Sequence, residues 1–216
     1  MRVPDRAYAA LKRVQILTGV LPVGLFLLSH LATNLRAVAG PDAFDRMAVA
    51  IQRIPHVEAI EWIAIAAPML VHVGLGIALG TTAQAAEDRR GYARPWLLTA
   101  QRVTGFWLVV YVIFHVFATR LSPARAPGGA DLFVLMSRAL RHPGVFAFHA
   151  AGVTAAAFHF GNGITALAGP WGLDAGPRGR ALAERLGVAS FAVLSLAGLF
   201  ALSAFVVPSL RWLAPR

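Results

Sequence analysis

Cysteine is missing from this chain of 216 residues. Its absence excludes disulfides, iron–sulfur clusters held by thiolates and covalently attached c-type haem, so any metal must be held by histidine or oxygen. Charge is also scarce, at 14% of residues, whereas a typical soluble domain carries about 25%. With 57% hydrophobic residues and a mean hydropathy of +0.63, the composition indicates a membrane protein.

Lysine is nearly absent as well: Lys12 is the single lysine among 20 basic residues. The formal net charge of +10 could indicate nucleic-acid binding, but the arginines stand singly or in pairs between apolar runs. No basic cluster with interleaved aromatic residues occurs, which argues against a nucleic-acid interface. Arginines that flank membrane helices at the lipid headgroups account for the charge.

Long apolar runs are abundant. Five of them have about 20 residues, enough to cross about 30 Å of hydrocarbon as a helix, and turn-rich charged segments separate them. The sequence therefore predicts an all-α membrane protein, a single domain over residues 1–216 built as a bundle of five transmembrane helices. The predicted spans are residues 14–35, 59–82, 97–121, 143–168 and 186–207.

The first span could instead be a secretory signal, because four basic residues precede it. Its apolar run exceeds the roughly 7–15 residues of a signal-peptide core and no small-residue cleavage site ends it, so a retained helix is favoured. Basic residues are slightly more numerous on the side that contains the N-terminus, which favours a cytoplasmic N-terminus.

Four of the seven histidines, His30, His72, His115 and His159, each lie in a different one of the first four spans, at intervals of 42 to 44 residues, and a fifth, His149, lies near the start of the fourth span. Helix geometry puts His72 and His159 about 14–15 Å from the inner surface, and His30 and His115 about 24–27 Å from it. The four residues therefore form two pairs, His72 with His159 and His30 with His115. The depths of the two pairs in the membrane differ by about 10 Å. Reversing the orientation exchanges the surfaces and leaves the pairing unchanged.

Two histidines that face each other from different helices at one depth can bind a haem iron from both sides. Imidazole suits iron, and two axial histidines leave no open position, so such a haem carries electrons without activating oxygen. We therefore predict two b-type haems enclosed by the bundle. Gly161 and Gly163, which follow His159, are expected to leave room for the porphyrin.

The structural alternative is that an intramembrane histidine serves only as a hydrogen-bond partner between helices. Four histidines, one per span and matched in depth, favour haem ligation. The other three, His56, His142 and His149, have no matched partner and are expected to have structural or interfacial roles.

Three charged residues at span ends have both a functional and a structural interpretation. Arg13 and Arg102 begin the first and third spans, where they would neutralise haem propionates or lie among lipid headgroups. Glu61, near the outer end of the second span, would exchange a proton with a quinone. Alternatively, it would only stabilise the positive end of a helix dipole.

Several segments resemble one known family: PMLVH in the second span, QRVTG at the start of the third, FHFGNGI in the fourth and WGLDAGPRGRALAERLGV after it. They are similar to the five-helix, dihaem cytochrome b membrane anchor of succinate:quinone oxidoreductases, the group of succinate dehydrogenases and quinol:fumarate reductases. The resemblance covers roughly residues 10–207. It implies that His72 and His159 bind the haem nearer a cytoplasmic iron–sulfur subunit, and that His30 and His115 bind the distal haem.

The resemblance also implies two partners outside this chain, a flavoprotein that oxidises succinate and an iron–sulfur protein that relays electrons. Electrons would pass through the two haems to a quinone near the outer side, menaquinone in relatives of this shape, or in reverse from quinol to fumarate. The chain would be the quinone-reactive subunit of the enzyme, multi-pass in a bacterial cytoplasmic membrane, without a dicarboxylate or flavin site of its own.

Two other functions stay open at this point. One is a dihaem b subunit of another quinone-linked dehydrogenase, for formate or hydrogen, against which the FHFGNG segment and the even spacing of the histidines argue. The other is a small transporter or proton channel with histidine relays. Transport sites usually need buried carboxylates or broken helices near the midplane, and no acid lies at mid-depth here.

Overall fold

The computed structural model describes residues 3–82, 95–122, 131–173 and 176–210, and this part of the chain contains helices and turns but no strand. The predicted connections at residues 83–94 and 123–130 lie outside it. Five described helices are long and apolar enough to cross a membrane, which confirms the all-α class and the five predicted membrane helices. They are Asp5–Ala39, Val57–Gly80, Trp96–Ala118, Pro143–Trp171 and Pro177–Ala204.

The first two spans each contain a π-helical turn, and each has a proline in or just after that turn. Pro22 lies inside the first turn, and Pro68 follows the second. Proline has no N–H to donate and its ring clashes with the preceding turn, so a locally widened helix accommodates it without a break. The first span consists of α1 (Asp5–Thr18), η1 (Gly19–Val23), α2 (Gly24–Asn34) and η2 (Leu35–Ala39), and the second of α4 (Val57–Ile60), η3 (Glu61–Ala66) and α5 (Ala67–Gly80).

The last three spans are long regular helices. Pro143 and Pro177 start two of them, at a position where the missing N–H costs nothing. The fifth begins at Pro177 and not near residue 186, because hydropathy detects only the part of a helix that lies in hydrocarbon, whereas charged residues such as Arg178 extend it into the headgroups. The elements are α7 (Pro95–Ala118), α9 (Pro143–Ala168), η5 (Gly169–Trp171), α10 (Pro177–Ala204) and η6 (Pro208–Leu210).

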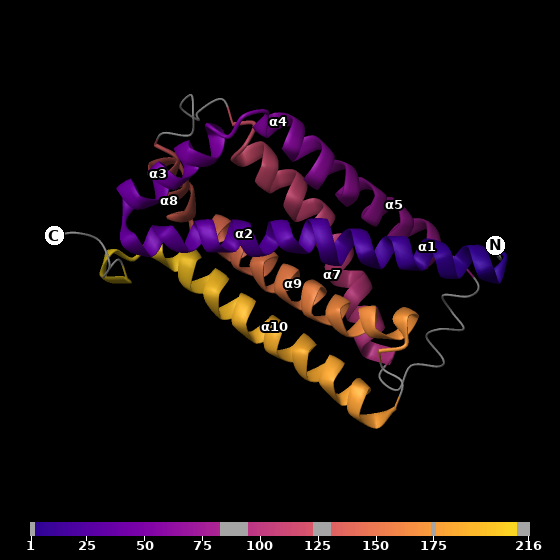
Figure 1. The fold of residues 1–216 in the computed structure, drawn as a ribbon. Helices are drawn as coiled ribbons and strands as arrows, with labels where there is room; N and C mark the ends of the chain where they lie inside the picture. Colours follow the sequence, from indigo (N-terminus) through magenta and orange to yellow (C-terminus); the bar gives the residue numbers. More distant parts are fainter. Residues whose placement is uncertain (1–2, 83–94, 123–130, 174–175, 211–216) are drawn as a thin grey trace.

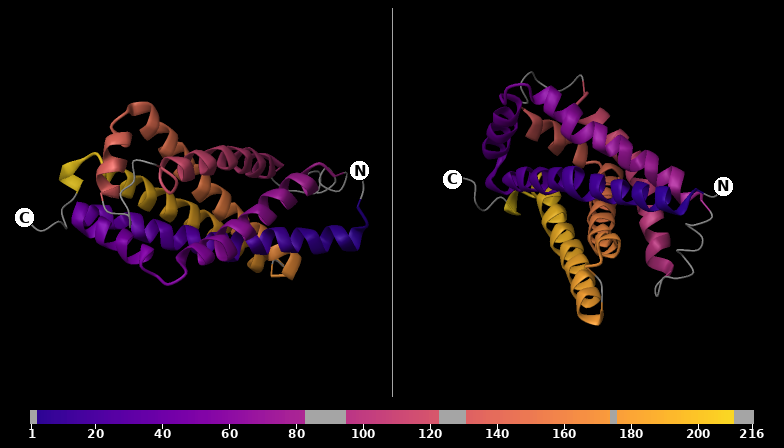
Figure 2. Two further views of the ribbon diagram at one scale, coloured as in Figure 1. Left: turned by 90° about the horizontal axis from the view of Figure 1, so that it is seen from above. Right: turned by 45° about the vertical axis from the view of Figure 1, so that its right-hand side comes forward.

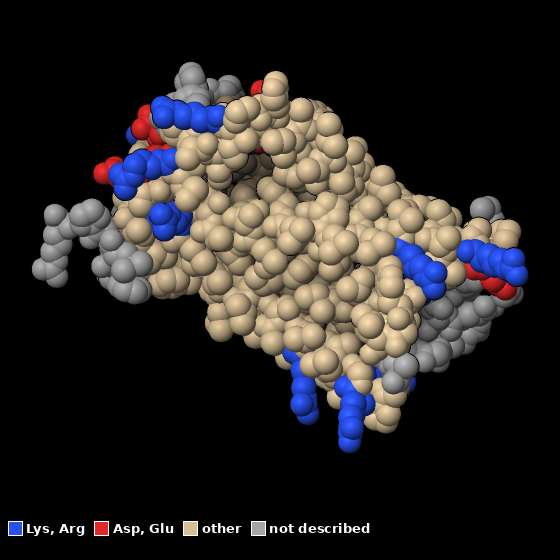
Figure 3. All heavy atoms as spheres, viewed as in Figure 1, with Lys and Arg blue, Asp and Glu red and all other residues tan. Residues whose placement is uncertain are grey.

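The helices form an elongated bundle in which α9 packs against α7 and α10, and α1 packs against α5 (Figures 1 and 2). The N-terminus lies at one end of the bundle, and α3 and α8 lie at the other (Figure 1). On the face shown in Figure 3, lysine, arginine and acidic side chains gather toward the two ends, and the described surface between them carries almost none. This distribution is what a bundle that spans a bilayer requires.

Two short helices close the end opposite the N-terminus, in connections where the sequence predicted only turn-rich segments. They are α3 (Pro41–Gln52) and α8 (Leu132–Leu140). Phe44 and Phe133 of these helices are buried with Phe205 at the end of α10, in a hydrophobic core. Asp45 of α3 accepts a hydrogen bond from the Phe133 N–H at 2.9 Å, which ties the two helices together.

Candidate functional site

The first pair of histidines, which we call the proximal pair, joins α5 to α9. The ring centroids of His72 and His159 lie 6.0 Å apart, with the ring planes at 83°. His72 Nδ1 lies 2.7 Å from the Gln15 carbonyl oxygen, and His159 Nδ1 lies 3.2 Å from the Gln101 carbonyl oxygen. Because a carbonyl can only accept, each Nδ1 carries a proton, and the Nε2 lone pair of each ring is free to bind a metal.

The second pair, the distal pair, joins α2 to α7. The ring centroids of His30 and His115 lie 5.8 Å apart, and their planes also meet at 83°. Phe26 stacks on His30, and Tyr111 stacks on His115. These aromatic neighbours restrict the rotation of both rings, although they provide no carbonyl acceptor like those of the proximal pair. The Nδ1 of His115 is buried and has no hydrogen-bond partner among the residues that the structure describes.

A third imidazole lies beside the distal pair, and the sequence prediction missed this. The ring of His149 in α9 is 5.8 Å from that of His115, although His149 was expected to have no partner in depth. Its Nδ1 donates to the Val145 carbonyl at 2.9 Å, while its buried Nε2 has no hydrogen-bond partner in the described part of the chain. The sequence could have indicated this: His149 is ten residues before His159, about 15 Å along the helix, which brings it within about 5 Å of the depth of the distal pair. The remaining two, His56 and His142, lie at the starts of α4 and α9.

The two pairs fit a haem iron by their chemistry and by their separation. Two imidazoles on opposite sides of one metal ion, each bound at about 2 Å, have ring centroids roughly 6 Å apart. Both pairs have this separation. Among the described residues no group of three or more His, Asp or Glu side chains is arranged to hold a metal ion. A haem iron needs only two protein ligands, because the macrocycle fills the other positions.

Some glycines leave space for the histidine rings, whereas Gly161 leaves space for a neighbouring helix. A methyl group on Gly19 would overlap the His72 ring, 2.5 Å from Nδ1, and a methyl group on Gly105 would lie 3.1 Å from His159 Cε1. Gly161 has a different neighbour from the porphyrin expected above: a methyl group there would lie 2.5 Å from the Gly187 carbonyl oxygen of α10. Close approach of α9 and α10 therefore accounts for this glycine.

Gly163 lies in a looser environment, toward the first span. The nearest atom to a methyl group built there is Val20 Cγ2 of η1, at 3.9 Å. Gly163 therefore has room beside it for the expected porphyrin, and it also fits ordinary packing of α9 against the first span.

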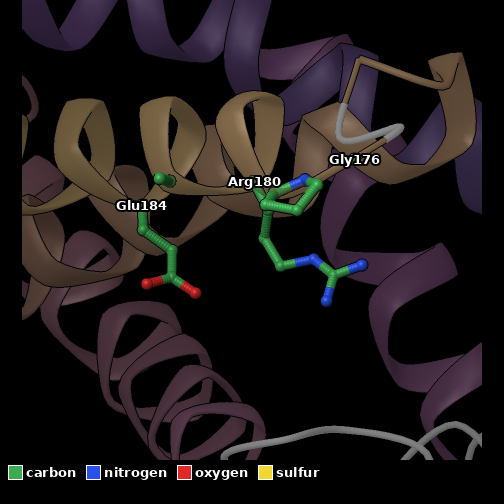
Figure 4. Close-up of a pocket in the computed structure, with 5 residues that line it drawn as sticks. Gly176, Arg180 and Glu184 are labelled. Atoms are coloured by element: carbon green, nitrogen blue, oxygen red, sulfur yellow. The ribbon is translucent and has the colours of Figure 1, made fainter.

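The candidate charged residues lie away from the proximal rings or at the ends of spans. Glu61 forms an ion pair with Arg120, which follows His115 by five residues, with 3.0 Å between Oε2 and Nη2. Arg13 is exposed, and Arg102 is half-buried at the start of α7. The described residues that line the surface pocket in Figure 4 belong to the first turns of α10 and the residue before them, with Arg180 and Glu184 extending from one face. A pocket built on one helix cannot enclose a cofactor that the histidine pairs would hold.

No protein-family model matches the chain. One similar protein is the succinate dehydrogenase cytochrome b558 subunit of Bacillus subtilis (strain 168), which is 35% identical over 196 residues. The matched region covers 90% of this chain and 96% of the relative, so the likeness extends over nearly the whole length of both. It confirms the resemblance to the cytochrome b anchors of succinate dehydrogenase.

Proposed function

The chain belongs to the family of succinate dehydrogenase cytochrome b558 subunits, and we propose that it carries electrons between an iron–sulfur partner and a quinone through two b-type haems. Family membership makes it a multi-pass membrane cytochrome b, the anchor subunit of an oxidoreductase complex. The alternatives of another dehydrogenase subunit or of a transporter have no comparable support. The number of haems, their ligands and the quinone reaction belong to the proposal.

The observation that carries the proposal is the geometry of the two histidine pairs. Each pair brings together two helices that are distant in sequence, and the two pairs have nearly the same separation and the same angle between ring planes. His72 and His159 are proposed as the axial ligands of the proximal haem, and His30 and His115 as those of the distal haem. Helix–helix hydrogen bonding would not require this repeated geometry, because each ring could bond to any nearby acceptor.

The residues around the pairs bind and orient, and the bound groups supply the redox chemistry. When bound, each haem would supply a one-electron couple, and ligation by two histidines would keep oxygen from its iron. The carbonyls of Gln15 and Gln101 keep the proton on Nδ1 of the proximal histidines, so that Nε2 remains the ligand atom. The apolar helices exclude water from both sites. The depth difference of about 10 Å would arrange the two sites in series across the bilayer.

We propose that the proximal pair lies toward the cytoplasm, with the N-terminus, and faces the iron–sulfur and flavoprotein partners. Arg102, half-buried at the start of α7, is the better candidate for a haem propionate, because Arg13 is exposed. A quinone, proposed as menaquinone, would react near the distal pair and the outer surface. Glu61 would serve as its proton group only if the ion pair with Arg120 opened.

A haem count on the purified complex tests the proposal. A pyridine haemochrome assay with a reduced-minus-oxidised spectrum should give two b-type haems per chain. His72→Ala and His159→Ala should each remove the same haem, and His30→Ala and His115→Ala should each remove the other. His142→Ala, at a helix start away from both pairs, is the control and should retain two. A chain that inserts and assembles with its partners but contains no haem would refute the electron-transfer function.

A further inference from the structure

Two segments of the chain share the pattern Q-x-x-T-G, QILTG at residues 15–19 and QRVTG at residues 101–105. The span that follows each segment contains a second shared pattern, H-x-G-x-G, which starts at the proposed ligand histidine. It is HVGLG at residues 72–76 and HFGNG at residues 159–163. We infer that each Q-x-x-T-G segment positions the ligand histidine of the next span, so that the proximal site consists of two half-sites built on the same backbone contacts. This inference rests on the proposed function, because it assigns the pair as ligands.

The first half-site lies between α1 and α5. The Gln15 carbonyl accepts a hydrogen bond from His72 Nδ1–H at 2.7 Å and also accepts the backbone N–H of Gly19. The Thr18 hydroxyl turns back onto its own helix and donates to the Val14 and Gln15 carbonyls at 2.9 and 3.0 Å. Gly19 leaves the space that the His72 ring fills.

The second half-site repeats these contacts between α7 and α9. The Gln101 carbonyl accepts from His159 Nδ1–H at 3.2 Å, and Gly105 leaves space for the ring. The Thr104 hydroxyl donates to the Ala100 and Gln101 carbonyls at 2.8 and 3.1 Å.

The spacing has a direct physical reason. In an α-helix the carbonyl of residue i points toward residue i+4, so a side chain at i+4 would cover the free lone pair of that carbonyl. A glycine four residues after the glutamine therefore exposes the carbonyl to a ring from another helix. A carbonyl acceptor on Nδ1–H fixes the tautomer and raises the basicity of the ligand nitrogen.

The two half-sites differ in their side-chain contacts, and this difference makes the inference testable. Thr104 Oγ1 lies 3.3 Å from His159 Nδ1 and can accept a second hydrogen bond from that N–H, whereas among the described residues the Thr18 hydroxyl bonds only to carbonyls of its own helix. The Gln101 side chain also donates to the His159 carbonyl at 3.1 Å and accepts from Asn162 at 3.0 Å. The residue that corresponds to Asn162 in the first half-site is Leu75, which cannot donate. Side chains as well as backbone therefore position His159.

The test compares Thr104→Val with Thr18→Val in the assembled complex, using redox titration of the two haems and the ferric low-spin EPR signal. Thr104→Val should retain two haems and raise the midpoint potential of the haem that His159→Ala removes, because a less basic imidazole stabilises ferric iron less. Thr18→Val should not raise the midpoint potential of this haem. Thr104→Ser, which keeps the hydroxyl, should have the wild-type midpoint potential. The potential of the distal haem should stay unchanged in all three variants.

Two results would overturn the inference, and each is distinct from a failure of the proposed function. If wild-type protein contains two haems but both valine variants leave the proximal potential unchanged, Thr104 does not position His159. If both variants shift it equally in one direction, the effect is general to the helices and not specific to the contact. The absence of haem from the wild-type complex would instead refute the proposed function itself.

Discussion

Gly161→Ala and Gly163→Ala form a matched pair that separates helix packing from haem packing in the FHFGNG segment. A methyl group at residue 161 would lie 2.5 Å from the Gly187 carbonyl oxygen and 3.1 Å from the Phe191 nitrogen. Ordinary contact begins at 3.4 Å, so α9 and α10 must separate by about 1 Å. At residue 163 the nearest atom is 3.9 Å away, and no movement is needed.

The expected magnitudes follow from these distances. Forcing a methyl group into a packed contact costs about 1–3 kcal/mol, whereas replacing glycine by alanine inside a helix contributes up to about 1 kcal/mol in favour of folding. Gly161→Ala should therefore be less stable than Gly163→Ala by about 1–3 kcal/mol. In a chain of this length each kcal/mol corresponds to roughly 2–4 °C in the unfolding temperature.

Thermal unfolding of the two variants in detergent, with the haem count recorded in parallel, measures this difference. Gly161→Ala should unfold at a lower temperature and retain haem until it unfolds. The reasoning is refuted if Gly161→Ala unfolds like the wild type but lacks the haem held by His159. In that case the glycine would face the cofactor and not α10.

Four further predictions concern the distal site, the ion pair between Glu61 and Arg120, and Asp45 in α3. His149→Ala should retain both haems, because His30 is the proposed partner of His115; loss of one haem here, with both retained in His30→Ala, would make His149 the ligand instead. Arg120→Gln should lower the free energy of unfolding by no more than about 1 kcal/mol, because the pair with Glu61 is about one-third exposed. If Glu61 is the quinone proton group, Glu61→Gln should slow quinone reduction by the complex well beyond any slowing in Arg120→Gln; equal rates in the two variants would exclude that role. Desolvation, together with the negative charges of Asp131 and Asp42, raises the pKa of Asp45 despite the hydrogen bond from Phe133. Protonated Asp45 therefore favours folding, and this contribution is present below its ordinary pKa of 3.8 and lost as the pH rises through the raised value. Asp45→Asn should remove this dependence, so unfolding temperatures of wild type and variant that run parallel between about pH 3.5 and 6 would contradict the assignment.

The sequence predicted the five membrane helices well, because about 20 apolar residues have few other stable arrangements. It also predicted which histidines meet, since depth along a straight helix follows from residue count alone. The extent of the helices beyond the hydrocarbon was missed, as were α3 and α8. Their formation depends on a shared core around Phe44 and Phe133 and not on hydropathy.

The surroundings of the histidines were harder to predict. The acceptors of the proximal pair are the backbone carbonyls of Gln15 and Gln101, and a backbone carbonyl is present at every residue, so no residue type marks it. The role of Gly161 depends on the distance between α9 and α10, which one helix cannot reveal. The repeated Q-x-x-T-G segments were visible in the sequence, but their meaning needed the contacts between spans.

The pairing of the four histidines is tested most directly by haem counts on double variants. His72→Ala with His159→Ala should leave one haem, as each single variant does, and so should His30→Ala with His115→Ala. His30→Ala with His72→Ala, which removes one ligand from each pair, should leave none. A chain that retains one haem after that last double substitution would contradict the account, because both replaced histidines would then serve the same haem or one would serve none.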